Sequence, residues 1–127
     1  MQTAQNRMDV IDYIADAYGV EAEYPWQDEN LIFRHRENGK WFGAILQVRR
    51  EKLGLPGEGI VDVLNLKCDA ILGGTLRTQP GFHPAYHMNK EKWISIRLDG
   101  TVSMETIENL IAVSYDLTGI KKKKLAK

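Results

Sequence analysis

The sequence predicts an α+β fold, a two-layer sandwich in which an antiparallel sheet carries an N-terminal and a C-terminal helix on one face. Three observations lead to it. Apolar residues repeat with a period near 3.6 close to both ends of the chain, and with a period of two between them. The connections between the alternating segments are mostly short, which favours antiparallel neighbours. Two amphipathic helices are enough to cover one face of such a sheet.

The first predicted helix covers residues 7–18. Gly19 is a natural stop for it, because glycine accepts a left-handed backbone at little cost. Its apolar stripe consists of Met8, Ile11, Ile14, Ala15 and Tyr18.

Four strands are predicted after this helix. Residues 31–36 and 40–48 form a hairpin, since Asn38-Gly39 between them is a strong turn signal. Residues 60–67 and 93–98 form the third and fourth strands. An additional short strand over 21–24 is compatible with the pattern.

The connections are less regular. Residues 50–59 read as an exposed loop, and residues 69–78 as a short helix weakened by Gly73-Gly74. Pro80-Gly81 and Pro84 then interrupt the chain.

The second long helix begins after Ser103, whose hydroxyl can cap it, and ends at Gly119. Glu105 and Glu108 suit the positive end of its dipole. Its inward stripe consists of Met104, Ile107, Leu110, Ile111, Ser114 and Leu117.

Length and composition indicate one soluble domain over 1–119, followed by a lysine-rich tail over 120–127 that we expect to be disordered. One cysteine excludes an internal disulfide, and no apolar run approaches a membrane span or a signal peptide. We expect a cytoplasmic protein and favour a monomer.

The net charge of zero conceals a strong segregation of charge along the chain. Residues 1–29 carry −6, residues 30–97 carry +5, residues 98–119 carry −4, and the tail carries +5. The acidic segments contain both long helices, and the basic segment contains the four strands. This pattern predicts an acidic helical layer backed by a basic sheet.

Strand parity adds detail to this prediction. In the last strand Ile94 and Ile96 point towards the helices, so Trp93 and Arg97 lie on the face that the helices leave uncovered. Arg34 and Arg36 share a face with Ile32 in the first strand, whereas the polar face of the third strand is not evident. We therefore expect an open sheet face that is basic and partly aromatic.

The chain resembles the MmcQ/YjbR family of small bacterial proteins over nearly its whole length. The resemblance implies a fold like that of bacterial frataxin (CyaY-like), described as a double wing, and a DNA-binding role, but no catalytic residues and no cofactor. The matching pieces are Tyr24-Pro25-Trp26, Phe33-Arg34-His35, residues 39–42 (GKWF), 63–69 (VLNLKCD) and 80–90 (PGFHPAYHMNK), Trp93, and Ser114-Tyr115-Asp116-Leu117.

DNA is accordingly the expected partner. Cationic side chains would contact phosphates and indoles would stack on bases, with little sequence selectivity, because no basic recognition helix stands out. The hairpin 33–42 would act as a wing, and the tail could add non-specific affinity. The candidate residues are Arg34, Arg36, Lys40, Trp41, Lys67, Lys90, Lys92, Trp93 and Arg97.

Two alternatives to DNA binding remain open. The same residues could form an ordinary solvated sheet face, since the chain without its tail has a net charge of −5. The face could also bind a protein or a small anion.

Metal binding and catalysis are weaker alternatives. His83 and His87 are four residues apart and Cys68 could join them, but the prolines nearby argue against a helix there. A hydrogen-bonded His87 that pins the loop before the last strand fits better. Asp9, Asp12 and Asp16 share one helical face, the place where the frataxin resemblance suggests iron. We expect neither a metal site nor an enzyme, and Cys68 in particular has no evident base to activate it as a nucleophile. Tyr24-Pro25-Trp26 is expected to be structural and to seal the helix–sheet edge.

Overall fold

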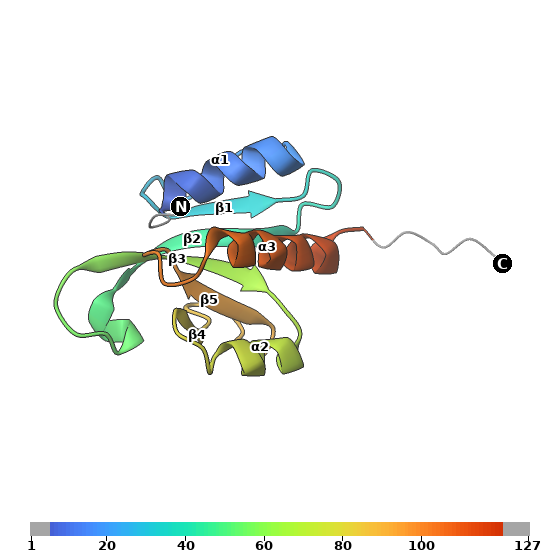
Figure 1. Ribbon diagram of the computed structural model, residues 1–127. Helices are drawn as coiled ribbons and strands as arrows, with labels where there is room; N and C mark the ends of the chain where they lie inside the picture. Colours follow the sequence, from blue (N-terminus) through green and yellow to red (C-terminus); the bar gives the residue numbers. More distant parts are fainter. Residues whose placement is uncertain (1–5, 121–127) are drawn as a thin grey trace.

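The computed structural model describes residues 6–120, which form a five-stranded antiparallel sheet with α1 and α3 on one face (Figure 1). The strand order is β1-β2-β3-β5-β4. This architecture confirms the predicted fold class. The elements are α1 (Arg7–Tyr18), β1 (Leu31–Arg34), β2 (Trp41–Arg49), the 3-10 turn η1 (Arg50–Leu53), β3 (Ile60–Lys67), α2 (Ala70–Leu76), β4 (Phe82–Pro84), β5 (Trp93–Arg97) and α3 (Met104–Thr118).

The ends of both long helices follow from capping residues. The side chains of Asn6 and Asp9 form a reciprocal capping box at the start of α1, and Gly19 ends it with φ +66°. The Ser103 hydroxyl accepts a hydrogen bond from the Thr106 N–H at the start of α3. Gly119 ends α3 in an extended conformation rather than a left-handed one. Within residues 6–120, none of the helices combines the length and the apolar character that crossing a membrane requires.

The main core lies between the sheet and the two long helices. It buries Ile14 of α1 and Ile111 of α3 against Phe33, Leu64 and Ile96 of three strands. Tyr18, His35, Phe42 and Tyr115 form an aromatic cluster at one end of this core, with ring centroids 4.3–6.2 Å apart. Burial of these large side chains is the dominant stabilising term for the fold.

A β-bulge interrupts the pairing of β1 and β2. Phe33 lies opposite Gly43 and Arg34 lies opposite Trp41, so Phe42 is the extra residue. Phe42 joins the helix-side core, whereas Trp41 packs with the apolar residues on the other face. The buried Ser114 hydroxyl of α3 stands at this point between β2 and β3: it donates to the Phe42 carbonyl (2.5 Å) and accepts from the Lys67 N–H (2.9 Å).

The sheet face opposite the helices is not open, contrary to the prediction. Five strand residues there form a second small core, which Leu53, Tyr86 and Met88 cover in part. The prediction failed because the strands carry apolar side chains on both faces, so parity alone could not show a covered face. The core residues are Ile32, Ala44, Leu46, Val48 and Val63.

A buried polar network fixes residues 85–88, the segment that contains Tyr86 and Met88, to the sheet beside this second core. Asn65 and Ser95 are both fully buried, and the Ser95 hydroxyl donates to the Asn65 amide oxygen at 2.5 Å. The Asn65 amide donates to the Tyr86 carbonyl (2.9 Å), and the Tyr86 N–H donates to Ser95 Oγ (3.0 Å). Each of the three residues therefore both donates and accepts within this triangle, in line with the rule that buried polar groups are hydrogen-bonded.

The remaining differences from the sequence prediction are local. Residues 82–84 form an edge strand, where a proline is tolerated because one side of an edge needs no N–H donor. Residues 50–53 form a 3-10 turn instead of a loose loop, and residues 21–24 contribute only one bridge, from Glu23 to Ile32. The predicted lysine tail lies, from Lys121 onward, outside the described residues.

Candidate functional site

Four predicted site residues form a row across four strands at one end of the sheet. Arg34 of β1 lies opposite Trp41 of β2, and Lys67 of β3 lies opposite Trp93 of β5. The two pairs are neighbours because β2 and β3 pair from Gly43 opposite Leu66 onward, and the Ser114 hydroxyl links the Phe42 carbonyl to the Lys67 N–H where that pairing stops. We call Arg34, Trp41, Lys67 and Trp93 the basic–aromatic row. Cations and indoles alternate along it.

Three lysines flank the row. Lys40 directly precedes Trp41 and Lys92 directly precedes Trp93, at the end of the sheet where β2 and β5 begin. Lys90 lies two residues further back and is exposed, like the other two. None of these flanking lysines, nor Lys67, forms an ion pair with a side chain in residues 6–120. Their ammonium groups are available to an anionic partner.

The arginines of the predicted site are already engaged. Arg34 forms an ion pair with Glu23 at 2.8 Å, and Arg36 donates to the Gly19 carbonyl at the end of α1. Arg97 lies at the far end of β5 from Trp93, with its Nε 3.5 Å from the carboxylate of Asp99. Arg36 and Arg97 therefore lie outside the row, and of the arginines only Arg34 belongs to it.

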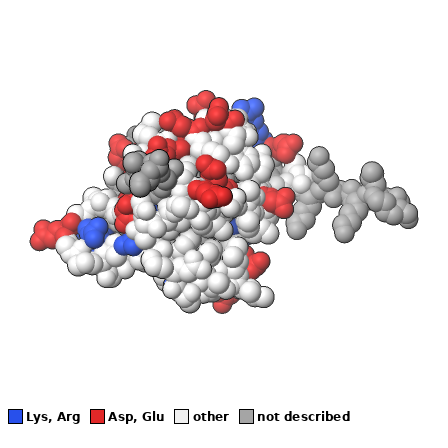
Figure 2. Space-filling view, viewed as in Figure 1, with Lys and Arg blue, Asp and Glu red and all other residues white. Residues whose placement is uncertain are grey.

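The charges of the two layers differ in sign. Helix α3 contains no lysine or arginine, and α1 contains one, Arg7, whose guanidinium is held by Asp62 at 2.8 Å. Figure 2 shows acidic side chains gathered on the α1 side of the molecule, with few basic ones in the same view. The helical layer is therefore unfavourable for an anion, whereas the lysines at the row carry charge that no carboxylate of residues 6–120 neutralises by an ion pair.

A pocket of about 500 Å³ adjoins the row. Its floor is the β2 face opposite the helices, and its walls come from the segments 26–30 and 87–88. The two indoles of Trp26 and Trp41 meet edge to face, with centroids 5.8 Å apart and planes at 84°. This size is ordinary for a small-molecule site, in which a few polar groups sit among apolar ones. The lining residues are Trp26, Asp28, Asn30, Trp41, Ala44, Leu46, His87 and Met88.

Two strained residues lie in the segments that form the walls of this pocket. Gln27 (φ +60°) and His87 (φ +62°) are the non-glycine residues with a left-handed backbone in the described part of the chain. Gln27 stands between two lining residues, and His87 is itself one of them. Such conformations are unfavourable and tend to gather at functional sites. The strained backbone is therefore a second observation, independent of the pocket's shape, that points to a functional site here.

The sequence prediction missed most of this pocket. Trp26 does not seal the helix–sheet edge, because it is 47% exposed and lies beside Trp41 on the other side of the sheet. Within residues 6–120 no side-chain hydrogen bond of His87 pins its loop; its ring packs on Tyr86 with centroids 4.0 Å apart and planes tilted by 47°, and the network of Asn65 and Ser95 holds the loop. The signal that could have pointed to the pocket was Trp26, a large aromatic residue outside the predicted helices and the four predicted strands.

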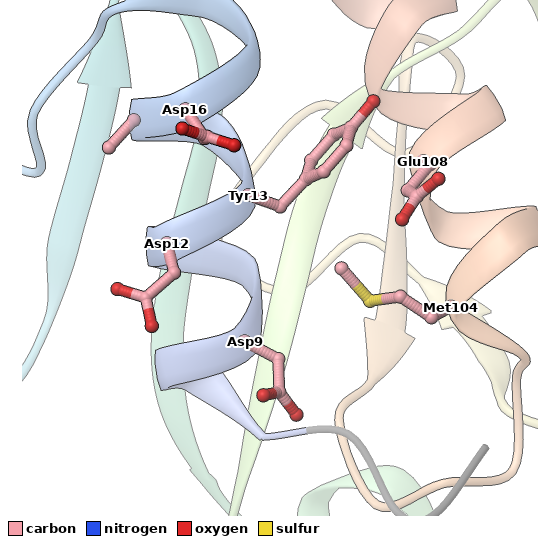
Figure 3. A pocket seen from close by; sticks show the side chains of 7 residues that line it. Asp9, Asp12, Tyr13, Asp16, Met104 and Glu108 are labelled. Atoms are coloured by element: carbon pink, nitrogen blue, oxygen red, sulfur yellow. The ribbon is translucent and has the colours of Figure 1, made fainter. Parts of the chain in front are cut away.

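The acidic residues of α1 line a different hollow, of about 600 Å³, between α1 and α3 (Figure 3). Asp9, Asp16 and Glu108 border it with Tyr13, but the Asp12 carboxylate points away from α3. Across residues 6–120, no three His, Cys, Asp or Glu side chains are grouped closely enough to hold a metal ion. Cys68 is buried, and this burial, helped by Asp69, raises the pKa of its thiol, which disfavours the reactive thiolate.

His83 gives the fold a testable pH dependence. Burial and, next, the Arg97 guanidinium lower the pKa of His83, although Asp99 opposes this, and its buried Nε2 has no hydrogen-bond partner in the described chain. The unfolded imidazole takes up a proton near pH 6.5, whereas the folded one stays neutral to a lower pH. The free energy of unfolding is therefore expected to fall as pH drops below about 6.5, and to level off below the folded pKa.

Urea denaturation of the wild type and of His83→Gln between about pH 7.5 and 5 measures this contribution. The variant is expected to show a flatter pH dependence. Parallel curves for the two proteins would assign the pH dependence to other groups.

Comparison with known proteins gives consistent results. The family model for YjbR matches residues 15–117. The uncharacterized protein YyaQ of Bacillus subtilis (strain 168) is 43% identical over 114 residues, which cover 88% of this chain and 97% of YyaQ. A crystal structure of a protein from Pseudomonas syringae has a TM-score of 0.87 at 40% identity and covers 90% of this chain and 99% of that one. The Deinococcus radiodurans protein DR2400, with a DUF419 domain, has a TM-score of 0.68 at 27% identity, over 92% and 81% of the two chains.

Proposed function

The chain belongs to the YjbR family, and from this premise we propose that it binds DNA through the basic–aromatic row and its flanking lysines. The observation that carries the proposal is the register of the sheet. Four strands bring two indoles and two cations into one line, on the side away from the acidic helices. DNA binding agrees with the cytoplasmic location expected from the sequence.

The chemistry of the row suits a nucleic acid backbone. Lysine ammonium groups neutralise phosphates and release condensed counterions, which makes the affinity depend steeply on salt. Exposed indole surface offers stacking to any base that leaves its own stack. The ion pair of Arg34 with Glu23 limits its contribution, so Lys67 and the flanking lysines supply most of the positive charge.

The binding is expected to depend weakly on base sequence. Helix α3 has no basic residue, and α1 has only Arg7, whose guanidinium Asp62 holds. Neither helix therefore offers a free arginine or lysine for the contact to guanine that is the commonest specific contact in the major groove. Contacts to phosphates position a protein without reading sequence.

Lys67→Gln tests the row directly. Lys67 lies at its centre, so the substitution is expected to weaken DNA binding by about three- to tenfold at ~50 mM salt. It should also reduce the magnitude of the salt slope, d log K/d log [salt], by about one. Fluorescence anisotropy with labelled duplex and single-stranded oligonucleotides over a salt series measures both quantities.

Arg49→Gln is the matched control. It removes the same charge from the opposite end of β2, about 26 Å along the strand from Trp41, where Arg49 is exposed. The control is expected to leave the affinity nearly unchanged. No binding at low salt, or a flat salt response, would overturn the proposal, and equal losses in the two variants would overturn the role of the row.

A further inference from the structure

We propose that the pocket beside the row takes up one unpaired nucleobase, so that the protein prefers single-stranded over duplex DNA. This inference rests on the proposed function and specifies its ligand. Trp41 belongs both to the row and to the pocket lining. A strand whose phosphates follow the lysines therefore passes the mouth of the pocket.

The walls of the pocket can hold an aromatic ring. Trp26 is half-exposed and packs edge to face on Trp41, so its indole keeps surface free for another ring. The side chains of His87 and Met88 also line the pocket. Bases stack on indoles regardless of their identity, and the sulfur of methionine also packs well on aromatic rings.

The distribution of charged side chains favours a neutral base inside the pocket and its phosphate outside it. The pocket lining contains no lysine or arginine and one carboxylate, Asp28, so an anion is disfavoured inside it. The cations lie outside, along the row and at its flanking lysines. A ligand with a neutral aromatic head and an anionic backbone matches this arrangement, and an unpaired nucleotide within a strand is such a ligand.

Two fixed polar side chains, Asp28 and Asn30, line the pocket. The Asp28 carboxylate accepts from the Asn30 N–H at 2.8 Å, and the Asn30 amide oxygen accepts from the Gln47 N–H at 2.8 Å. Each group is held by these bonds and keeps hydrogen-bonding capacity. A carboxylate accepts from the exocyclic amino groups of cytosine and adenine, and the neighbouring Asn30 amide can donate to the ring nitrogen beside each of them; thymine presents an N–H between two carbonyls and lacks this pair. The pocket should therefore favour cytosine and adenine over thymine.

The strain at Gln27 and His87 supports a preformed pocket. Both backbones are held left-handed without a glycine, and the network of Asn65, Ser95 and Tyr86 fixes the segment that contains His87. A base in a duplex reaches such a pocket only after unstacking and unpairing, which cost a few kcal/mol. A single strand avoids most of this cost.

Trp26→Ala is the test, with labelled oligo-dC, oligo-dA and oligo-dT of equal length and a duplex of the same total charge. Loss of stacking is expected to weaken binding of single-stranded oligo-dC and oligo-dA by at least about fivefold. Duplex affinity and the salt slope should stay unchanged, since Trp26 carries no charge. Trp26→Phe should restore most of the loss, and thermal unfolding of each variant checks that it is folded.

The outcomes separate this inference from the proposed function. If single strands and duplex bind equally and Trp26→Ala changes neither affinity, the pocket inference is wrong while binding through the row stands. If no nucleic acid binds at low salt, both fail. Tighter binding of oligo-dT than of oligo-dC in the wild type would contradict the assigned role of Asp28.

Discussion

Gly81→Ala is expected to lower the free energy of unfolding by about 3 kcal/mol. Gly81 is buried with φ +89°, a backbone conformation that L-residues adopt only at a cost of about 1–2 kcal/mol. An added Cβ would also lie 2.6 Å from Val102 Cγ2 and 3.1 Å from Thr101 Cγ2, so the loop before α3 would have to move. Such overpacking typically costs a further 1–3 kcal/mol.

Gly39→Ala is the control for this prediction. Gly39 has a similar φ of +73°, but a Cβ there would meet nothing within 4 Å, so only the backbone term of about 1 kcal/mol applies. Urea denaturation of the two variants and the wild type gives the difference. Equal losses in both variants would show that contact with Val102 and Thr101 contributes nothing.

Asn65→Ala is expected to have a comparable effect, a loss of about 2–4 kcal/mol. The substitution removes the donor to the Tyr86 carbonyl and the acceptor for the Ser95 hydroxyl, both in a buried site. A buried group left without its partner costs about 1–3 kcal/mol, and a small cavity adds to the loss. Hydrogen exchange at residues 85–88 should rise as well, since the segment loses its anchor.

A double-mutant cycle with Ser95→Ala tests the network. Once Asn65 is gone, Ser95 has lost one of its two partners, so the second substitution should cost less in the Asn65→Ala background than in the wild type. Strict additivity of the two losses would contradict the coupling. Val61→Ala, on the same strand and sheet face but outside the network, provides a control for simple loss of volume.

The fold was largely accessible from the sequence because its signals are local. The stripe over 7–18, the cap at Ser103 and the Asn38-Gly39 turn each act within a few residues, and the structure confirms the elements that they predict. Residues 60–67 likewise form the strand that their alternation predicts. The strand at 82–84 was missed because it is only three residues long, too short for an alternating pattern, and contains Pro84.

The candidate site was accessible only in part. Parity placed Trp93 and Arg34 correctly on the side away from the helices. Parity could not show that Glu23 binds Arg34, that Asp99 lies beside Arg97, or that residues 85–88 cover the centre of the sheet. Those contacts join segments that are distant in sequence or irregular in structure, and the periodic spacing of apolar residues cannot predict such contacts.

The hydroxyl that Ser114 places between β2 and β3 has a consequence for the basic–aromatic row. One atom of α3 satisfies both Phe42 and Lys67 where the bulge parts them, next to the residue that turns Trp41 away from the helices. Alanine at this helix position would leave the Phe42 carbonyl and the Lys67 N–H without their shared partner, and a buried group without its partner costs about 1–3 kcal/mol. The position of Trp41 and Lys67 in the basic–aromatic row thus depends on a side chain of the opposite, helical layer.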